Sequence, residues 1–148
     1  MKIRISDDAL AIACGADTVA QAFMHAGAEV ERVSSWGMHW LEPLVDVEGV
    51  GYANVTADQV GTILAGEAES IGAIAEHPFL TVQSRLTFAR AGKTRPTSLD
   101  DYYASEGWLG LAKARAIGAD ATIETVFASG LRGRGGAGFP AGIKWKTV

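Results

Sequence analysis

The chain has few of the residues that disulfides and metal clusters require, and it lacks the long apolar runs that cross membranes. Its 148 residues include one cysteine, Cys14, and three histidines. A single cysteine excludes an internal disulfide and any iron–sulfur cluster held by several cysteines of this chain alone. No apolar run approaches the ~20 residues of a membrane-spanning helix, and the start of the chain (1–6) is too short and polar for a signal peptide. We therefore expect a cytoplasmic protein with no direct membrane insertion.

The chain also lacks an excess of positive charge. Thirteen basic and 17 acidic residues give a formal net charge of −4, so overall electrostatics give no reason to expect a nucleic-acid partner. Apolar residues make up 48% of the chain, which is enough for a packed core. The length fits one ordinary domain, or one and a half small ones.

Glycine, by contrast, is concentrated near the end of the chain. Six glycines fall between Gly130 and Gly142, and the cations Arg132, Arg134 and Lys144 accompany them. Glycines let backbone N–H groups approach a ligand closely, and flanking cations favour an anion. The spacing matches neither a Rossmann turn nor a P-loop. The pattern predicts a site for a phosphate or another anion.

A flexible linker is the alternative interpretation of this glycine-rich stretch. The two arginines, together with Phe139 and Trp145, argue against it because flexible linkers seldom carry such side chains. The residues before the stretch, 122–129, indicate a helix that ends at Gly130.

The stretch from Gly130 to Trp145 reads GLRGRGGAGFPAGIKW. It resembles the flavin-site loop of the NADH-oxidising subunit of respiratory complex I. The same family includes the diaphorase subunits of NAD-linked hydrogenases and of NAD-dependent formate dehydrogenases. The family usually has threonine where this chain has Ala141. The resemblance implies FMN along Gly133, Arg134 and Gly135.

The resemblance also implies a phosphate near Lys144 and a nicotinamide nucleotide held with the help of Gly136 and Phe139. The full cofactor-binding set that it implies is Gly133, Arg134, Gly135, Gly136, Ala137, Gly138, Phe139 and Lys144. It implies electron transfer between NAD(H) and FMN, in which the cofactor supplies the reactivity and the protein the positioning. No residue of this chain is expected to be catalytic in its own right or to bind a metal.

The chain stops at Val148, shortly after the loop, with no helix or sheet expected to follow. We therefore expect an N-terminal fragment of a longer flavin subunit. By the resemblance, a [4Fe–4S] cluster would belong to the missing downstream part. The fragment alone is expected to be inactive as an oxidoreductase and to bind FMN weakly or not at all.

The first 66 residues show the periodicities of a small α/β domain. Alternating or β-branched runs predict strands, and apolar residues at helical spacing predict helices that end at glycine. The expected strands are 2–6, 29–33, 44–48 and 51–55, and the expected helices are 17–26 and 57–64. The resulting order is β-α-β-β-β-α.

This order, with Glu42–Val47 and Tyr52–Thr56, resembles the thioredoxin-like ferredoxin domain of the same family. Cluster-bearing relatives have cysteines where this chain has Ser35 and His39, and an upstream cysteine near Ala11, beside Cys14. The resemblance thus implies a degenerate domain without a cluster. Because the beta subunits of formate dehydrogenase carry such a domain, the chain resembles them most. Its partners would be a molybdenum catalytic subunit and a small [2Fe–2S] subunit.

The segment 34–40 holds two tryptophans and a histidine. Trp36 and Trp40 are expected either to face a partner subunit or to cover the base of the small domain. His39 lacks a second ligand at a suitable spacing, which argues against a metal site. Cys14 is expected to be a small buried apolar residue.

We place a domain linker at 67–80, so that 1–66 is the thioredoxin-like domain and 81–148 is the start of an FMN- and NAD-binding α/β domain. The segment 79–90 is expected to enter and pack on this second domain. Helices are expected from Ser98, which can cap the N–H of Asp101, across 107–117, and across 120–127.

Three assignments stay open. The first is a diaphorase-type subunit of an NAD-dependent formate dehydrogenase. The second is the equivalent subunit of an NAD-reducing hydrogenase or of complex I. The third is a non-catalytic docking or scaffold subunit, which would have no need of Arg132, Arg134 and Lys144 around six glycines.

Overall fold

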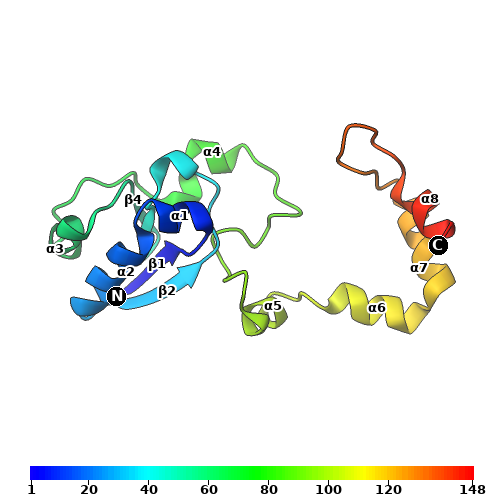
Figure 1. Cartoon of the computed structure of the whole chain (residues 1–148), viewed down its shortest axis with the longest axis horizontal. Coiled ribbons are helices and arrows are strands. Elements are labelled where there is room, and N and C mark those ends of the chain that lie inside the picture. Colours follow the sequence, from blue (N-terminus) through cyan, green and yellow to red (C-terminus); the bar gives the residue numbers. More distant parts are fainter. The chain divides into compact units, whose positions relative to one another are not determined.

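The computed structural model describes all residues from 1 to 148. The chain divides into an N-terminal unit, Met1–Asp101, and a C-terminal unit, Tyr102–Val148 (Figure 1). The N-terminal unit contains β1 (Lys2–Ser6), α1 (Ala9–Ala13), α2 (Ala16–His25), β2 (Glu29–Val33), η1 (His39–Leu41), β3 (Val45–Val47), β4 (Val50–Tyr52), η2 (Ala57–Gln59), α3 (Val60–Leu64), η3 (Ile74–Glu76) and α4 (Pro78–Thr81). The remaining helices are α5 (Leu99–Ala104), α6 (Leu109–Ile117), α7 (Ala119–Ala128) and α8 (Ala141–Lys146).

The N-terminal unit is built on a four-stranded sheet in the order β2-β1-β3-β4. β1 and β2 are parallel, and β3 is antiparallel to both of its neighbours. Ile3 and Ile5 pair with Val47 and Val45, so the alternating apolar residues of the strands meet on one face. This order and these directions are those of the thioredoxin fold. The α/β class and the thioredoxin-like arrangement predicted from the sequence are therefore confirmed.

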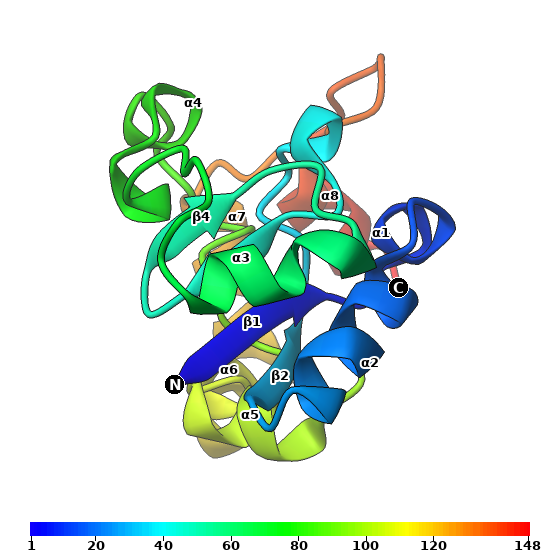
Figure 2. The ribbon, with the colours of Figure 1, turned by 90° about the vertical axis from the view of Figure 1, so that its left-hand side faces the viewer.

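Helices α2 and α3 cover that apolar face (Figure 2). Phe23 of α2 and Ile63 of α3 are buried in the same cluster as Ile3 and Ile5. Thr56 and Gln59 form a capping box where the predicted helix 57–64 begins, and that helix divides into η2 and α3.

The short helix α1 was not predicted. Asp8 caps it by accepting hydrogen bonds from the N–H groups of Leu10 and Ala11, both at 2.9 Å. Cys14 lies at its end and is exposed. The expectation of a buried Cys14 is therefore wrong.

The segment expected to be a linker, 67–80, packs against the N-terminal unit. Ile71 donates its N–H to the carbonyl of Gly51 at 2.9 Å and thereby covers the outer edge of β4. Ile74 is buried in a second apolar cluster with Trp36. Arg85 donates from Nη2 to the Trp36 carbonyl at 2.9 Å, so part of 79–90 also contacts this unit rather than a following domain. The placement of a linker at 67–80 stays a prediction.

The two neighbouring tryptophans have different environments. Trp36 is 6% exposed and belongs to the second apolar cluster, as one of the two alternatives expected. Trp40 is 55% exposed, and its ring meets the edge of Phe79 at 4.9 Å between centroids.

Helix α5 spans the boundary between the two units, and the C-terminal unit consists of helices with one buried residue, Gly142. Ser98 Oγ accepts the N–H of Asp101 at 3.1 Å, which confirms the predicted cap of α5. α7 matches the helix predicted to end at Gly130, whose φ is +66°. A further helix, α8, follows the glycine loop and packs on α7, contrary to the expectation that none would follow. No helix in the structure combines the length and apolar character needed to cross a lipid bilayer.

Candidate functional site

The glycine-rich stretch forms a closed loop between α7 and α8, drawn in orange in Figure 1. At its neck, Ala141 donates its N–H to the carbonyl of Leu131, and Gly133 donates to the carbonyl of Phe139, both at 2.8 Å. These two bonds hold the incoming and outgoing strands of the loop together. Such fixed geometry argues against the flexible-linker interpretation.

Arg132 stabilises the loop from inside. Its Nε donates to the carbonyl of Gly138 at 2.7 Å, and the N–H of Gly138 reaches the carbonyl of Gly135 at 3.1 Å. Gly138 has φ +54°, a conformation that glycine adopts at little cost. Arg132 and Gly138 therefore shape the loop, and this cation is engaged with the backbone.

The tip of the loop presents donors that the chain does not use. The backbone N–H groups of 134–137 donate no hydrogen bond within the chain, and the Arg134 side chain is exposed without a partner. No atom lies within 4 Å of a Cβ built on Gly135 or Gly136, and neither has a positive φ. The fold gives no internal reason for glycine at these two positions. A ligand that approaches the bare backbone does give one.

Lys144 and Phe139 lie together at the end of the loop where α8 begins. The Lys144 Nζ is 5.7 Å from the centroid of the Phe139 ring, within the range of a cation–π contact. Lys146, in contrast, is paired with Glu124 at 2.7 Å. Residues 125–148 contain four Lys or Arg and no acid. The loop therefore lies in a positive segment, although the chain as a whole is negative.

The structure brings all eight predicted cofactor-binding residues into the loop and the first turns of α8, but it separates their possible roles. Gly133 has its N–H engaged with Phe139, whereas Gly135, Gly136 and Ala137 have theirs free. Gly142 was missed: it is buried where α8 crosses α7, against the backbone of Phe127. Pro140, directly before α8, is the signal that could have indicated this helix.

A polar network occupies the part of the N-terminal unit where the resemblance places cluster cysteines. Ser35 Oγ donates to Oε1 of Glu42 at 3.2 Å, and Leu44 donates its N–H to Oε2 of Glu42 at 2.9 Å. His39 is exposed on η1. No group of three or more His, Cys, Asp or Glu side chains converges on a common point that could hold a metal ion.

Glu42 is a buried carboxyl without a cation paired to it. Burial raises its pKa, and the hydrogen bonds from Leu44 and Ser35 oppose this rise only in part. Asp8 lies near it: burial would raise the pKa of Asp8, but hydrogen bonds from Ala11, Ser6 and Leu10 hold it below its ordinary value. The two carboxyls of this network are therefore shifted in opposite directions.

We expect Glu42→Gln to remove a pH-dependent loss of stability. The folded state holds the Glu42 proton more tightly than the unfolded chain does. This contribution is thus complete below the ordinary carboxyl pKa and is lost as the pH rises through the raised value. The free energy of unfolding, measured with urea, should therefore rise in Glu42→Gln relative to the parent chain as the pH increases above the ordinary carboxyl pKa. The exposed Glu67→Gln is the control, and an equal pH slope in all three proteins would contradict the prediction.

The comparisons with known proteins concern short stretches of much longer chains. No family model matches. The chain is 49% identical over 63 residues to the NADP-reducing hydrogenase subunit HndC of Solidesulfovibrio fructosivorans, covering 43% of this chain and 13% of that protein. It is 55% identical over 51 residues to a subunit of the NADH-quinone oxidoreductase of Streptomyces coelicolor, covering 34% and 11% respectively. Its homologues are subunits of NADH- and NADP-linked oxidoreductases.

The matches among solved structures have low sequence identity. A thioredoxin-like [2Fe-2S] ferredoxin from Aquifex aeolicus matches 49% of this chain and 90% of its own, with 18% identity and a TM-score of 0.42. The chain spans about an eighth of the length of the curated relatives above.

Proposed function

We propose that this chain belongs to an NAD(H)-linked flavin subunit of complex I or hydrogenase type, and that its glycine loop binds the phosphate-bearing cofactors. The observation that carries the proposal is the tip of the loop. Gly135 and Gly136 have open space around them, and four consecutive N–H groups donate nothing to the chain. Homology to NADH- and NADP-linked subunits supports the same conclusion.

The residues of the loop fit an anionic cofactor. The free N–H groups of 134–137 would donate to phosphate oxygens or carbonyls, and Arg134 would add a charge-assisted bond. Lys144 would neutralise a phosphate, and Phe139 would offer an aromatic surface to a nucleotide base. FMN, when bound, would supply hydride acceptance from NADH, while the chain binds and orients the two nucleotides.

The test is a titration of the 148-residue chain with FMN, followed by the backbone amide resonances of the loop. We expect saturable shifts of Gly135 and Gly136, weak in absolute affinity, and smaller shifts with riboflavin, which lacks the phosphate. Arg134→Ala should weaken FMN binding about tenfold, because it removes a hydrogen bond to a charged group. Arg115→Ala removes the same charge from exposed α6 and should leave binding unchanged.

Two outcomes would contradict the proposal. If neither FMN nor NADH moves the loop resonances, or if Arg115→Ala weakens FMN binding as much as Arg134→Ala does, the loop is no specific cofactor site. The non-catalytic docking subunit would then be the better interpretation, because the N-terminal unit would retain its fold without a ligand.

We propose further that the chain belongs to a cytoplasmic NAD-dependent formate dehydrogenase, together with a molybdenum subunit and a small [2Fe–2S] subunit. Ser35 and His39 at the expected ligand positions support it, since Ser35 is engaged with Glu42. The native complex, purified through this chain, should reduce NAD⁺ with formate and contain molybdenum. Reduction of NAD⁺ by hydrogen, with nickel in place of molybdenum, would assign it to the hydrogenase type instead.

A further inference from the structure

The N-terminal unit has a pocket, remote from the glycine loop in sequence, that neither the homology nor the loop explains. It measures about 380 Å³ and lies against the sheet face opposite to α2 and α3. Arg4 of β1 and Asp46 of β3 form its floor, and Trp36, Leu80 and Ile74 form apolar walls. Its volume is within the range of small-molecule sites.

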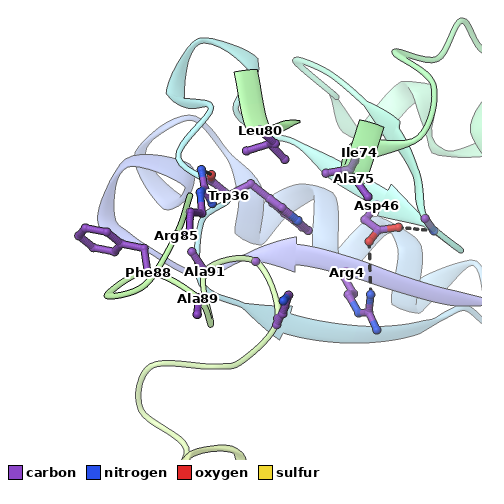
Figure 3. A pocket seen from close by; sticks show the side chains of 13 residues that line it. Arg4, Trp36, Asp46, Ile74, Ala75, Leu80, Arg85, Phe88, Ala89 and Ala91 are labelled. Atoms are coloured by element: carbon purple, nitrogen blue, oxygen red, sulfur yellow. Dashed lines mark hydrogen bonds and ion pairs between the residues drawn. The ribbon is translucent and has the colours of Figure 1, made fainter. Parts of the chain in front are cut away.

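A hydrogen-bond donor with no partner in the chain faces this space. Figure 3 shows the indole of Trp36 extending towards Asp46 and Arg4. Trp36 is 6% exposed, and its indole N–H donates no hydrogen bond within the chain. Because the indole nitrogen only donates, the group that completes this site has to be an acceptor.

The pocket lining has a net positive charge, whereas the N-terminal unit as a whole has a net negative charge. The N-terminal unit carries seven Lys or Arg and 14 Asp or Glu. The pocket is lined by three cations, Arg4, Arg85 and Lys93, and by one acid. That acid, Asp46, is already engaged: it pairs with Arg4 at 3.5 Å and accepts the N–H of Gly49 at 2.6 Å.

The three cations differ in how many ion pairs and hydrogen bonds they already make within the chain. Arg4 is held by Glu31 at 3.0 Å as well as by Asp46. Arg85 donates to neutral oxygens of Gln83 and Trp36, so its charge is not neutralised by an acid. The Lys93 side chain is exposed and has no partner. The pocket therefore offers donors and positive charge, and no free acceptor.

We propose that this pocket binds a small organic anion with a planar apolar body, such as an aromatic carboxylate. The flat body packs against the apolar wall that Trp36, Leu80 and Ile74 form. The carboxylate accepts from Lys93 and from the Trp36 indole N–H. An uncharged ring would not neutralise the cations of the pocket. A small inorganic or aliphatic anion would not contact its apolar walls.

The experiment uses the whole chain and the indole N–H resonances of its four tryptophans. The Trp36 signal is identified by its loss in Trp36→Phe. Benzoate is the probe, with benzamide as the matched neutral ring and acetate as the matched anion without a ring. We expect a saturable shift of the Trp36 signal with benzoate, and affinities for benzamide and acetate weaker by about fivefold or more.

Lys93→Gln should weaken benzoate binding about threefold, the effect of removing one exposed charge pair. Lys113→Gln, on exposed α6, is the control and should have no effect. The proposal is overturned if benzoate leaves the Trp36 signal unmoved, or if benzamide or acetate binds as tightly as benzoate. It is also overturned if the two lysine variants behave alike. Binding of benzoate with no response of the FMN-sensitive glycines would support this site independently of the cofactor loop.

Discussion

Replacing Gly142 by alanine is expected to separate α8 from α7. A Cβ at this position would overlap the Cα and N atoms of the Phe127 backbone, which lies inside α7 and has no freedom to withdraw. Gly142 is also the one buried residue of the C-terminal unit. Overpacking of this kind costs about 3 kcal/mol. We expect α8 to lose its protection against amide hydrogen exchange.

The same change should open the loop, because Ala141 donates the bond that closes its neck and lies next to Gly142. The shifts of Gly135 and Gly136 with FMN should disappear with it. Gly110→Ala is the matched control: Gly110 lies in α6 with open space around it, so alanine should stabilise that helix by about 1 kcal/mol. Unchanged exchange rates in α8 of Gly142→Ala would contradict the prediction, because they would mean that α8 packs on α7 loosely enough to accept a Cβ at this position.

The sequence predicted most of the secondary structure because local signals agree with the fold there. Strands 2–6 and 29–33 coincide with β1 and β2, since their alternating residues meet across the sheet. α1 was missed because five residues give too little periodicity, although Asp8 was a valid cap. The burial of Trp36 and the exposure of Trp40 were left open, because that difference depends on residues 71–80, which are distant in sequence.

For the loop, the sequence identified the residues of the site. It did not show which of them the fold requires and which of them are free to contact a ligand. Three of its six glycines have structural reasons: Gly130 and Gly138 have positive φ, and Gly142 contacts Phe127. Gly135 and Gly136 have none. Backbone angles and neighbouring atoms are set by tertiary structure. From composition alone, all six glycines were therefore interpreted alike, as possible ligand contacts. The distinction restricts the proposed ligand contacts to the tip.

Arg132 and Arg134 illustrate the same limit for charge. The two arginines are two residues apart and look equivalent in a sequence. In the structure one is bonded to the Gly138 carbonyl and the other is free. A variant at Arg132 would therefore disturb the loop itself, whereas Arg134 tests ligand binding with the loop intact. Arg134→Ala therefore reports on FMN binding without disturbing the hydrogen bonds of the loop.

Gly92→Ala is expected to destabilise the N-terminal unit strongly. Gly92 has φ +75°, and a Cβ there would overlap the indole ring of Trp36. The indole belongs to the buried cluster of Val33, Met38, Leu44 and Ile74, so it has little room to move. Backbone strain and overlap together should cost about 3 kcal/mol in the free energy of unfolding.

Gly66→Ala separates these two causes. Gly66 has the same φ of +75° but nothing near its Cβ position, so alanine there should cost only the ~1 kcal/mol of a left-handed conformation. Urea unfolding of both variants, followed by circular dichroism, measures the difference. A gap of about 2 kcal/mol assigns the larger loss to the Trp36 contact. Equal losses would mean that the segment 85–94 does not press on the indole. The wall that this segment and Trp36 give to the pocket of the N-terminal unit would then be absent in solution.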